Sequence, residues 1–276
     1  MNEERRGGEA KGPPPRAQKS GVNVVGVVPT ESEVRLAVDV RRPEGVRLWR
    51  SLRRRARLGP YRLGPPARRL VRDVYWDTRD RALGLALVAL RVRQVLGRAL
   101  IITVKLPGSV AGNLTERPEF ERELTPAAVA EVLGLIAPYL PAGAARGPAA
   151  VARDRAAVAA LTAAFSRSVA SAPLEPILTA HTRRLTRAVL LGDARRAELV
   201  MDRVTFFGAR DQRLRAPAEH IVEVEAAALG SATDALAVES HVLALAAAAG
   251  PGGPAAVRGE PRSKLERGLA LTGGAR

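Results

Sequence analysis

The sequence predicts an α+β fold in which helices flank a closed antiparallel β-barrel with a charged interior. Charged residues recur two positions apart within short apolar segments, and strand-like segments follow one another through tight connections. Side chains at positions i and i+2 of a strand point to the same face. An open sheet does not normally hide a charged face, whereas a closed barrel can place it inside, around an ionic ligand. The segments with this alternation are Glu31-Ser32-Glu33-Val34-Arg35, Arg91-Val92-Arg93, Arg117-Pro118-Glu119-Phe120-Glu121, His181-Thr182-Arg183 and Glu223-Val224-Glu225.

The first half of the chain predicts an arm, a helix and five strands. Residues 1–28 are rich in Gly, Pro and charged residues and predict a disordered basic arm, so the folded domain is expected at residues 29–276. A strand is expected at about 31–40. The segment from Arg41 to Arg72 carries twelve arginines and predicts a helix that ends before Gly59-Pro60. Further strands are expected at 70–76, 86–94, 100–105 and 119–124, with the tight connections that favour antiparallel pairing.

The second half predicts helices on both sides of a second set of strands. Thr125-Pro126 begins an Ala-rich helical stretch, which is expected to break at 138–148 and to resume to about residue 168. Strands are expected at 177–184, 187–191, 197–207 and 218–226. An Ala/Leu helix is expected at 233–249, and a basic segment around Lys264 follows it.

Composition restricts the partners and the compartment. The net charge of +16 and the pI of about 11.4 favour a polyanionic partner: nucleic acid, an anionic membrane or a phosphorylated small molecule. The absence of cysteine excludes disulfides, thiolate metal sites and a cysteine nucleophile, and it fits a cytoplasmic protein. The apolar runs are too short for a membrane-spanning helix, and the N-terminus shows no signal peptide.

Two lysines stand out in a chain that otherwise uses arginine. Of the four lysines, Lys11 and Lys19 lie in the arm, which leaves Lys105 and Lys264 in the folded part. An ammonium group is a compact point charge, unlike the planar guanidinium of arginine. We interpret these two lysines as functional, with codon drift as the alternative.

The carboxylates of the first and last strands predict a metal site. First and last strands are natural neighbours in a closed antiparallel barrel, so Glu31 and Glu33 are expected to meet Glu223 and Glu225, with Asp202 nearby. Such a cluster ionises fully only when a divalent cation neutralises it, and an all-oxygen donor set suits Mg²⁺ or Mn²⁺. The alternative is a pair of solvated acidic strands on an outer face. Three histidines are too few for a multi-histidine metal centre.

The cations predict a phosphate-binding surface opposite these carboxylates. Arginine forks and lysine point charges are the usual ligands of phosphate oxygens. Cations that face metal-bound carboxylates across a lumen would hold a polyphosphate at one end and polarise it at the other. The candidate residues are Arg91, Arg93, Lys105, Arg117, His181, Arg183 and Lys264.

In this order the motifs resemble the CYTH superfamily of triphosphate tunnel metalloenzymes, over about residues 29–272. To the five segments above, the resemblance adds Tyr75-Trp76-Asp77-Thr78, Thr103-Val104-Lys105, Val200-Met201-Asp202 and Ser263-Lys264-Leu265-Glu266-Arg267. Both lysines of the folded part fall on lysine positions of the family. Arg35 replaces an expected lysine, and His181 stands where some members carry lysine or arginine.

The resemblance implies a metal-dependent triphosphatase inside an antiparallel tunnel of eight strands. The implied phosphate ligands are Arg35, Arg91, Arg93, Lys105, Arg117, Arg183 and Lys264. The implied ligands of Mg²⁺ or Mn²⁺ are Glu31, Glu33, Asp202, Glu223 and Glu225. Glu31, Glu33, Lys105 and Lys264 are the implied catalytic residues, with Glu119, Glu121 and His181 in supporting positions.

The substrate and the alternative functions are read from the few aromatic residues and from the arginine-rich segment. Aromatic residues make up 3% of the chain, and stacking of an organic ring needs aromatic planes, so inorganic triphosphate is the favoured substrate. Thiamine triphosphatase, class IV-type adenylate cyclase and polyphosphate polymerase chemistry stay open, because fold does not choose between them. In another class, a non-catalytic protein would bind RNA or long polyphosphate through residues 41–72 and the arm, unless that segment is simply a solvated helix face.

Overall fold

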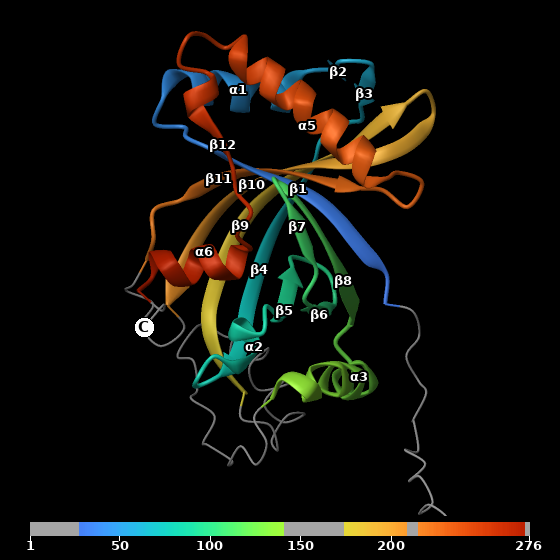
Figure 1. Ribbon diagram of the computed structural model, residues 1–276, viewed down its shortest axis with the longest axis vertical. Helices are drawn as coiled ribbons and strands as arrows, with labels where there is room; N and C mark the ends of the chain where they lie inside the picture. The colour runs from blue at the N-terminus through green and yellow to red at the C-terminus, as the bar shows by residue number, and fades with distance from the viewer. Residues whose placement is uncertain (1–27, 141–173, 209–214, 274–276) are drawn as a thin grey trace, which may run out of the picture.

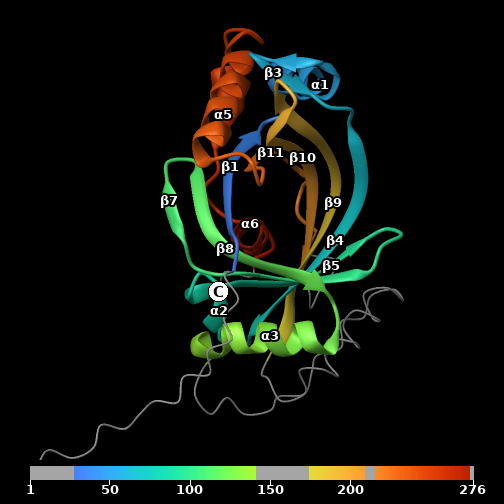
Figure 2. The ribbon, with the colours of Figure 1, turned by 90° about the vertical axis from the view of Figure 1, so that its right-hand side faces the viewer.

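Eight antiparallel strands close into a barrel (Figures 1 and 2). The computed structural model describes residues 28–140, 174–208 and 215–273. The strands follow the order β10-β11-β1-β8-β6-β5-β4-β9, and β9 pairs back to β10, which confirms the predicted closed barrel. The barrel strands are β1 (Thr30–Val38), β4 (Ala67–Thr78), β5 (Ala89–Val95), β6 (Leu100–Lys105), β8 (Leu114–Glu123), β9 (Leu174–Leu191), β10 (Ala194–Gly208) and β11 (Glu219–Ala226).

Short strands extend the sheet of the barrel, and helices surround the barrel. The strand β12 (Val257–Gly259) pairs with β1, β7 (Ser109–Ala111) pairs with β8, and the hairpin of β2 (Arg57–Leu58) and β3 (Tyr61–Leu63) pairs with β9. The helices and 3₁₀ turns are α1 (Pro43–Arg54), α2 (Ala82–Leu85), α3 (Pro126–Ile136), η1 (Ala137–Tyr139), α5 (Ala232–Ala247), η2 (Pro254–Ala256) and α6 (Lys264–Leu271). Among these helices, none combines the length and the apolar character that a membrane crossing requires.

The alternation of β1 explains how the barrel separates its two faces. Val34 and Leu36 are fully buried in an apolar cluster that also contains side chains of α1 and α5. Glu33 and Arg35, at the intervening positions, line the lumen. Burial of the outward apolar residues under the two helices therefore forces the charged residues of the same strand inward.

The helix α6 closes one side of the barrel and carries a functional side chain. Ser263 caps the helix by accepting a hydrogen bond from the backbone N–H of Glu266, whose carboxylate accepts one from the N–H of Ser263 in return. Leu265 packs in an apolar cluster with Leu178 and other residues of β9 and β10. A Cβ at Gly268 would collide with Leu178 and Phe206, so only glycine allows this close approach. The packing fixes the first residue of the helix, Lys264, against the lumen.

The structure changes some of the predicted boundaries. The two strands expected at 177–184 and 187–191 are a single strand, β9, whose whole length pairs with β4, β10 or β3. Val28, which the arm was predicted to include, packs against the apolar cluster around β5, β6 and α3. The rest of the predicted arm and the helical stretch expected near 149–168 lie outside the described residues.

Candidate functional site

Alternate side chains of the barrel strands, with the start of α6, line a cavity of about 450 Å³ in the lumen. The lining is dominated by charge, with nine cations and six carboxylates, so the predicted charged interior is present. The lining cations are Arg35, Arg69, Arg91, Arg93, Lys105, Arg117, Arg122, Arg184 and Lys264. The lining carboxylates are Glu31, Glu33, Glu119, Glu121, Glu223 and Glu225.

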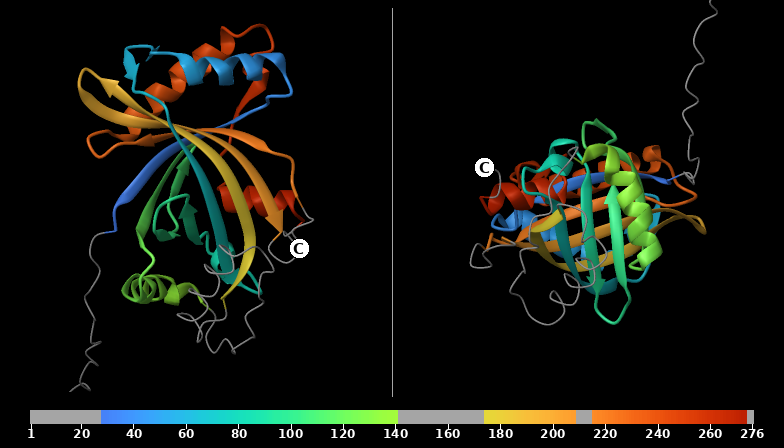
Figure 3. Two further views of the ribbon diagram at one scale, coloured as in Figure 1. Left: turned by 180° about the vertical axis from the view of Figure 1, so that it is seen from behind. Right: turned by 90° about the horizontal axis from the view of Figure 1, so that it is seen from below.

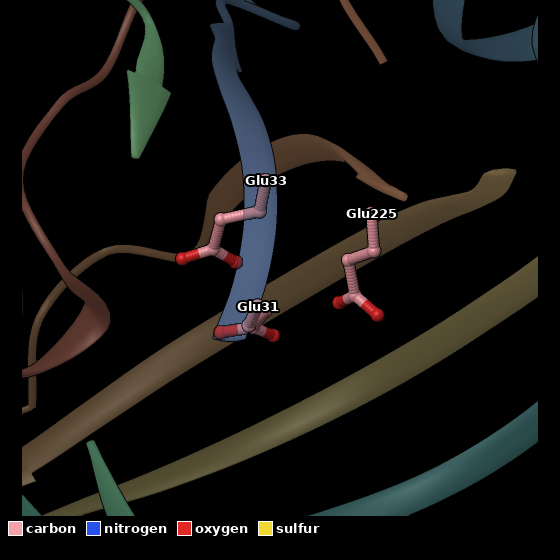
Figure 4. A group of neighbouring side chains, drawn as sticks. All are labelled: Glu31, Glu33 and Glu225. Carbon is pink, nitrogen blue, oxygen red and sulfur yellow. The ribbon is translucent and has the colours of Figure 1, made fainter. Parts of the chain in front are cut away.

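Three of these carboxylates form a cluster, which we call the trio: Glu31, Glu33 and Glu225. Each offers an oxygen that lies within 4.8 Å of the others (Figure 4). The cluster follows from strand register, because Glu33 of β1 sits directly opposite Glu225 of β11 and Glu31 lies two residues before Glu33 on the same face. Three carboxylates from two rigid strands form the all-oxygen donor set that hard divalent cations prefer.

The charges of the trio are only partly balanced by the protein. Lys105 pairs with Glu31, and Arg117 Nη2 donates to Glu33 Oε1 at 2.8 Å. Glu225 reaches a single cation within the described residues, Arg184 Nη1 at 4.0 Å. Burial raises the pKa of Glu225 to about 8; the charge of Arg184 opposes this rise and the neighbouring carboxylates add to it. The trio therefore fits a group that brings additional positive charge.

Asp202 and Glu223, two further predicted metal ligands, lie in a neighbouring ion-pair cluster. The Arg184 guanidinium donates to both Asp202 oxygens at 2.9 and 2.7 Å and to Glu223 Oε2 at 3.1 Å. Lys264 Nζ lies 2.7 Å from Asp202 and 3.0 Å from Glu223. Burial opposes ionisation of Glu223, but Lys264 and Arg184 outweigh it and hold the pKa of that carboxyl well below its usual range. The two predicted ligands are thus already neutralised by the chain's own cations.

A third cluster lies on the wall formed by β4 and β5. The guanidinium of Arg93 forks onto Asp73, with nitrogen–oxygen distances of 2.7 and 3.2 Å. Arg91 lies between Asp73 at 4.0 Å and Glu119 at 3.4 Å. Burial alone would raise the pKa of Asp73, but the charges of Arg93 and Arg91 outweigh it and lower that pKa strongly. Asp73 therefore keeps both arginines oriented across the lumen.

Two further predicted cations, Lys105 and Arg35, also lie in the lumen. Lys105 is buried, and its ammonium lies 3.3 Å from Glu119 as well as beside Glu31. Burial lowers the pKa of Lys105, but the charges of Glu31 and Glu33 reverse this and raise it above its usual value. Arg35 lies 3.3 Å from Glu33 and donates to the hydroxyl of Thr115 at 3.2 Å and to the carbonyl of Arg262.

The structure corrects the placement of two predicted residues, Arg183 and His181. Both lie on the outer face of β9, where the ring of His181 is 4.7 Å from that of Phe207. The lumen-facing neighbour is Arg184. Leu185 shares the parity of Arg183 and packs outward beneath α1, so the strand turns Arg183 outward with it.

Sequence reasoning missed Asp73 and Arg184 and passed over Arg69, Tyr75 and Arg122, which also line the cavity. A signal for Asp73 was available, because a lone carboxylate between Val71 and Val74 in a largely apolar strand requires a buried partner. The parity of Leu185 and Val189 would have identified Arg184 in the same way, since large apolar side chains mark the outward face of this strand.

Comparison with known proteins identifies the family. The profile of the CYTH domain matches residues 52–235, about two thirds of the chain, a range that contains Glu223 and Glu225 but neither β1 nor α6. No curated protein sequence matches the chain significantly.

Solved structures with a similar arrangement come from diverse organisms. A Hippeastrum protein, described as a candidate adenylyl cyclase with a dominant triphosphatase activity, covers 87% of this chain and 95% of its own, at 14% identity and a TM-score of 0.48. A candidate adenylate cyclase from Bacillus halodurans covers 86% of this chain and 97% of its own, at 18% identity and a TM-score of 0.44. The triphosphatase of the mimivirus capping enzyme covers 78% of this chain and 88% of its own, at 10% identity and a TM-score of 0.40. From the profile match, the chain belongs to the CYTH family, whose enzymes are metal-dependent triphosphate hydrolases.

Proposed function

We propose that the chain hydrolyses inorganic triphosphate to diphosphate and phosphate in the lumen, with Mg²⁺ or Mn²⁺ as its cofactor. The observation that supports this proposal most strongly is the cavity of about 450 Å³ in which nine cations surround a trio of carboxylates. Cations of this kind bind phosphate oxygens, and carboxylates bind hard divalent ions.

The trio of Glu31, Glu33 and Glu225 would hold the metal ion. A divalent ion held there would neutralise the carboxylates and polarise the terminal phosphoryl group. Lys105 and Arg117, which balance Glu31 and Glu33 in the absence of a metal ion, would then be available to phosphate oxygens. In this proposal the metal ion would replace Lys105 and Arg117 as the counter-charge of Glu31 and Glu33, and the two cations would bind the substrate instead.

Four further cations of the lumen would hold the rest of the phosphate chain. Arg91 and Arg93 approach from β5, and Arg184 and Lys264 approach from β9 and α6. A carboxylate oxygen of the trio would accept a proton from the attacking water. Positioning and charge neutralisation provide most of the catalysis in phosphoryl transfer, so no protein nucleophile is required.

The lining favours an inorganic substrate. Tyr75 is the only aromatic residue among the described residues that line the cavity, and it is buried. An adenine or thiamine ring would need exposed aromatic planes for stacking. Inorganic triphosphate needs only the charges that are present.

A second candidate is an organic triphosphate, as in a thiamine triphosphatase or an adenylate cyclase. A cavity of about 660 Å³ adjoins the lumen and shares Arg35, Ala89 and Arg117 with it. Its walls include the exposed side chains of Leu85, at 80% exposure, and Leu87, at 64%. Such a surface favours an organic group beside the phosphate chain.

A product assay with inorganic triphosphate, ATP and thiamine triphosphate, each with Mg²⁺ or Mn²⁺, tests both candidates. We expect phosphate release from inorganic triphosphate that stops in excess EDTA, and its loss in Glu31→Gln but not in the control Glu131→Gln, which changes an exposed carboxylate of α3. Cyclic AMP from ATP would favour the cyclase. Turnover that persists in EDTA would contradict the metal-dependent mechanism, and no turnover of any substrate would favour a non-catalytic polyanion-binding protein.

A further inference from the structure

The outer face of β4, β9 and β10 carries a dense group of arginines, which we call the outer wall. Arg72, Arg183, Arg203 and Arg215 line a cavity of about 670 Å³ on this face. Next to it, Arg53, Arg68 and Arg98 join Arg183 and Arg203 around a cavity of about 830 Å³. No carboxylate is among the described residues that line either cavity. In Figure 3, left, β4 (teal) and β9 (yellow) run across this side of the barrel, with α1 (blue) above them.

The described part of the chain supplies no carboxylate partner to the cations of the outer wall. In the described ranges, no ion pair involves Arg72, Arg183, Arg203 or Arg215. Arg183 of β9 lies directly opposite Arg203 of β10 in the strand register. Like charges at directly opposed positions destabilise a sheet, and an anion that bridges them removes the cost. The surface is therefore complementary to a ligand with several negative charges.

Aromatic rings lie among these arginines. The rings of His181 and Phe207 are 4.7 Å apart in the first cavity, and both residues are half-buried. Trp49 lines the second cavity and is also half-buried. A cationic groove combined with aromatic platforms is the arrangement that binds single strands, because every base offers a face for stacking. A duplex presents its bases only as edges in its grooves and gains nothing from such rings.

We propose that the outer wall binds single-stranded nucleic acid, with phosphates on Arg72, Arg183 and Arg203 and a base on the His181–Phe207 pair. This proposal is independent of triphosphate hydrolysis, because the side chains project from the barrel wall on the opposite side from the lumen. It also relocates the expected polyanion surface. In segment 41–72, Arg41 and Arg47 are paired with Asp39 and Glu44, whereas Arg68 and Arg72 belong to the outer wall.

The salt dependence of binding tests the phosphate contacts. A labelled single-stranded RNA oligonucleotide with a 5′-hydroxyl end is titrated with the full chain in EDTA over a series of salt concentrations. For a triple Arg72→Gln, Arg183→Gln and Arg203→Gln variant, we expect the slope of log affinity against log salt to fall by about 2, since each phosphate contact on a single strand contributes about 0.7. Affinity at low salt should fall about tenfold or more.

A matched control removes the same charge elsewhere. The triple Arg41→Gln, Arg47→Gln and Arg195→Gln variant removes three exposed arginines that have carboxylate partners, and it should keep the parent slope. A triple Arg→Lys variant of the outer wall should retain most of the slope, and thermal melts should show that all variants are folded. Equal loss of slope in both glutamine variants, or no binding by the parent at low salt, would overturn the proposal.

The ring contact separates nucleic acid from other polyanions. Phe207→Leu should weaken binding of the single-stranded RNA about fivefold, because base stacking on an aromatic ring is lost, and it should leave binding of inorganic polyphosphate unchanged. Polyphosphate that binds as tightly as RNA, with neither affected by Phe207→Leu, would identify a polyphosphate surface instead. Tighter binding of an RNA duplex than of the single strand would also overturn the proposal.

Discussion

Arg183 and Arg184 are neighbours on one strand, yet they belong to regions with opposite electrostatic character. Arg184 is neutralised by Asp202 and Glu223 in the lumen, whereas Arg183 has no counter-charge among the described residues of the outer wall. Seven of the nine cations in the lumen form ion pairs with carboxylates. The difference shows that the number of arginines does not reveal their role. What decides it is whether the strand register supplies a carboxylate opposite each one.

The largest expected difference between the two regions is in stability. Arg184→Ala leaves the buried Asp202 and Glu223 with Lys264 alone, so we expect the free energy of unfolding to fall by about 3–5 kcal/mol. Arg183→Ala removes an exposed charge and should change it by no more than about 0.5 kcal/mol. Urea unfolding of both variants measures the contrast, and Arg184→Gln serves if the alanine variant does not fold. Equal effects at the two positions would contradict the claim that buried carboxylates make Arg184, but not Arg183, important for stability.

Asp73 gives a smaller effect with a defined pH dependence. Its folded pKa is lowered, so its contribution to stability is present above the unfolded pKa of about 3.9 and is lost as pH falls through the folded value. We expect Asp73→Asn to cost about 2 kcal/mol at pH 7 and the difference from the parent to shrink below about pH 4. Urea unfolding at several pH values checks this. A difference that stays constant down to pH 3 would mean that the ionised carboxylate is not what stabilises Arg91 and Arg93.

The third prediction concerns the rate of triphosphate hydrolysis after removal of either lysine in the lumen. Lys105→Ala and Lys264→Ala should each lower the rate of triphosphate hydrolysis about tenfold or more, which corresponds to about 1.4 kcal/mol in the transition state. Arg50→Ala, on the exposed face of α1, is the matched control and should leave the rate unchanged. If both lysine variants hydrolysed triphosphate at the parent rate, neither ammonium group would contribute to catalysis more than a surface arginine does.

Arg35→Lys gives the smallest expected change, and charge reversal at the same position tests the register of β1. Its guanidinium contacts Glu33, Thr115 and the carbonyl of Arg262 together, a fork that a single ammonium cannot reproduce. We expect Arg35→Lys to lower kcat/KM for triphosphate about threefold and Arg35→Glu to abolish turnover. A folded Arg35→Glu variant with the parent rate would place residue 35 outside the lumen, which would refute the assigned register.

The sequence allowed the barrel and the convergence of the carboxylates of β1 and β11 to be predicted, because both depend on strand parity. Glu31 and Glu33 alternate with Val34 and Leu36 along β1, and Glu223 and Glu225 alternate with Val222 and Val224, so the charged face was readable without the structure. Parity alone could not separate the trio from the Asp202–Glu223 cluster. That distinction depends on which cations reach each carboxylate from other elements, above all Arg184 and Lys264. Arg183 was wrongly predicted to face the lumen, because the sequence alone does not tell which of two adjacent arginines points inward. The outward packing of Leu185 shows that it is Arg184.

Closure of the barrel between β1 and β11 has a consequence for folding. The strands come from opposite ends of the folded domain, so their pairing closes a very long loop and carries a large entropic cost. Contacts of such high sequence separation form slowly, and until they form β1 exposes an unpaired edge. Glu33 and Glu225 meet only across this seam. We therefore expect the trio to assemble after the local hairpins have formed, and a chain in which the seam is still open contains no such site.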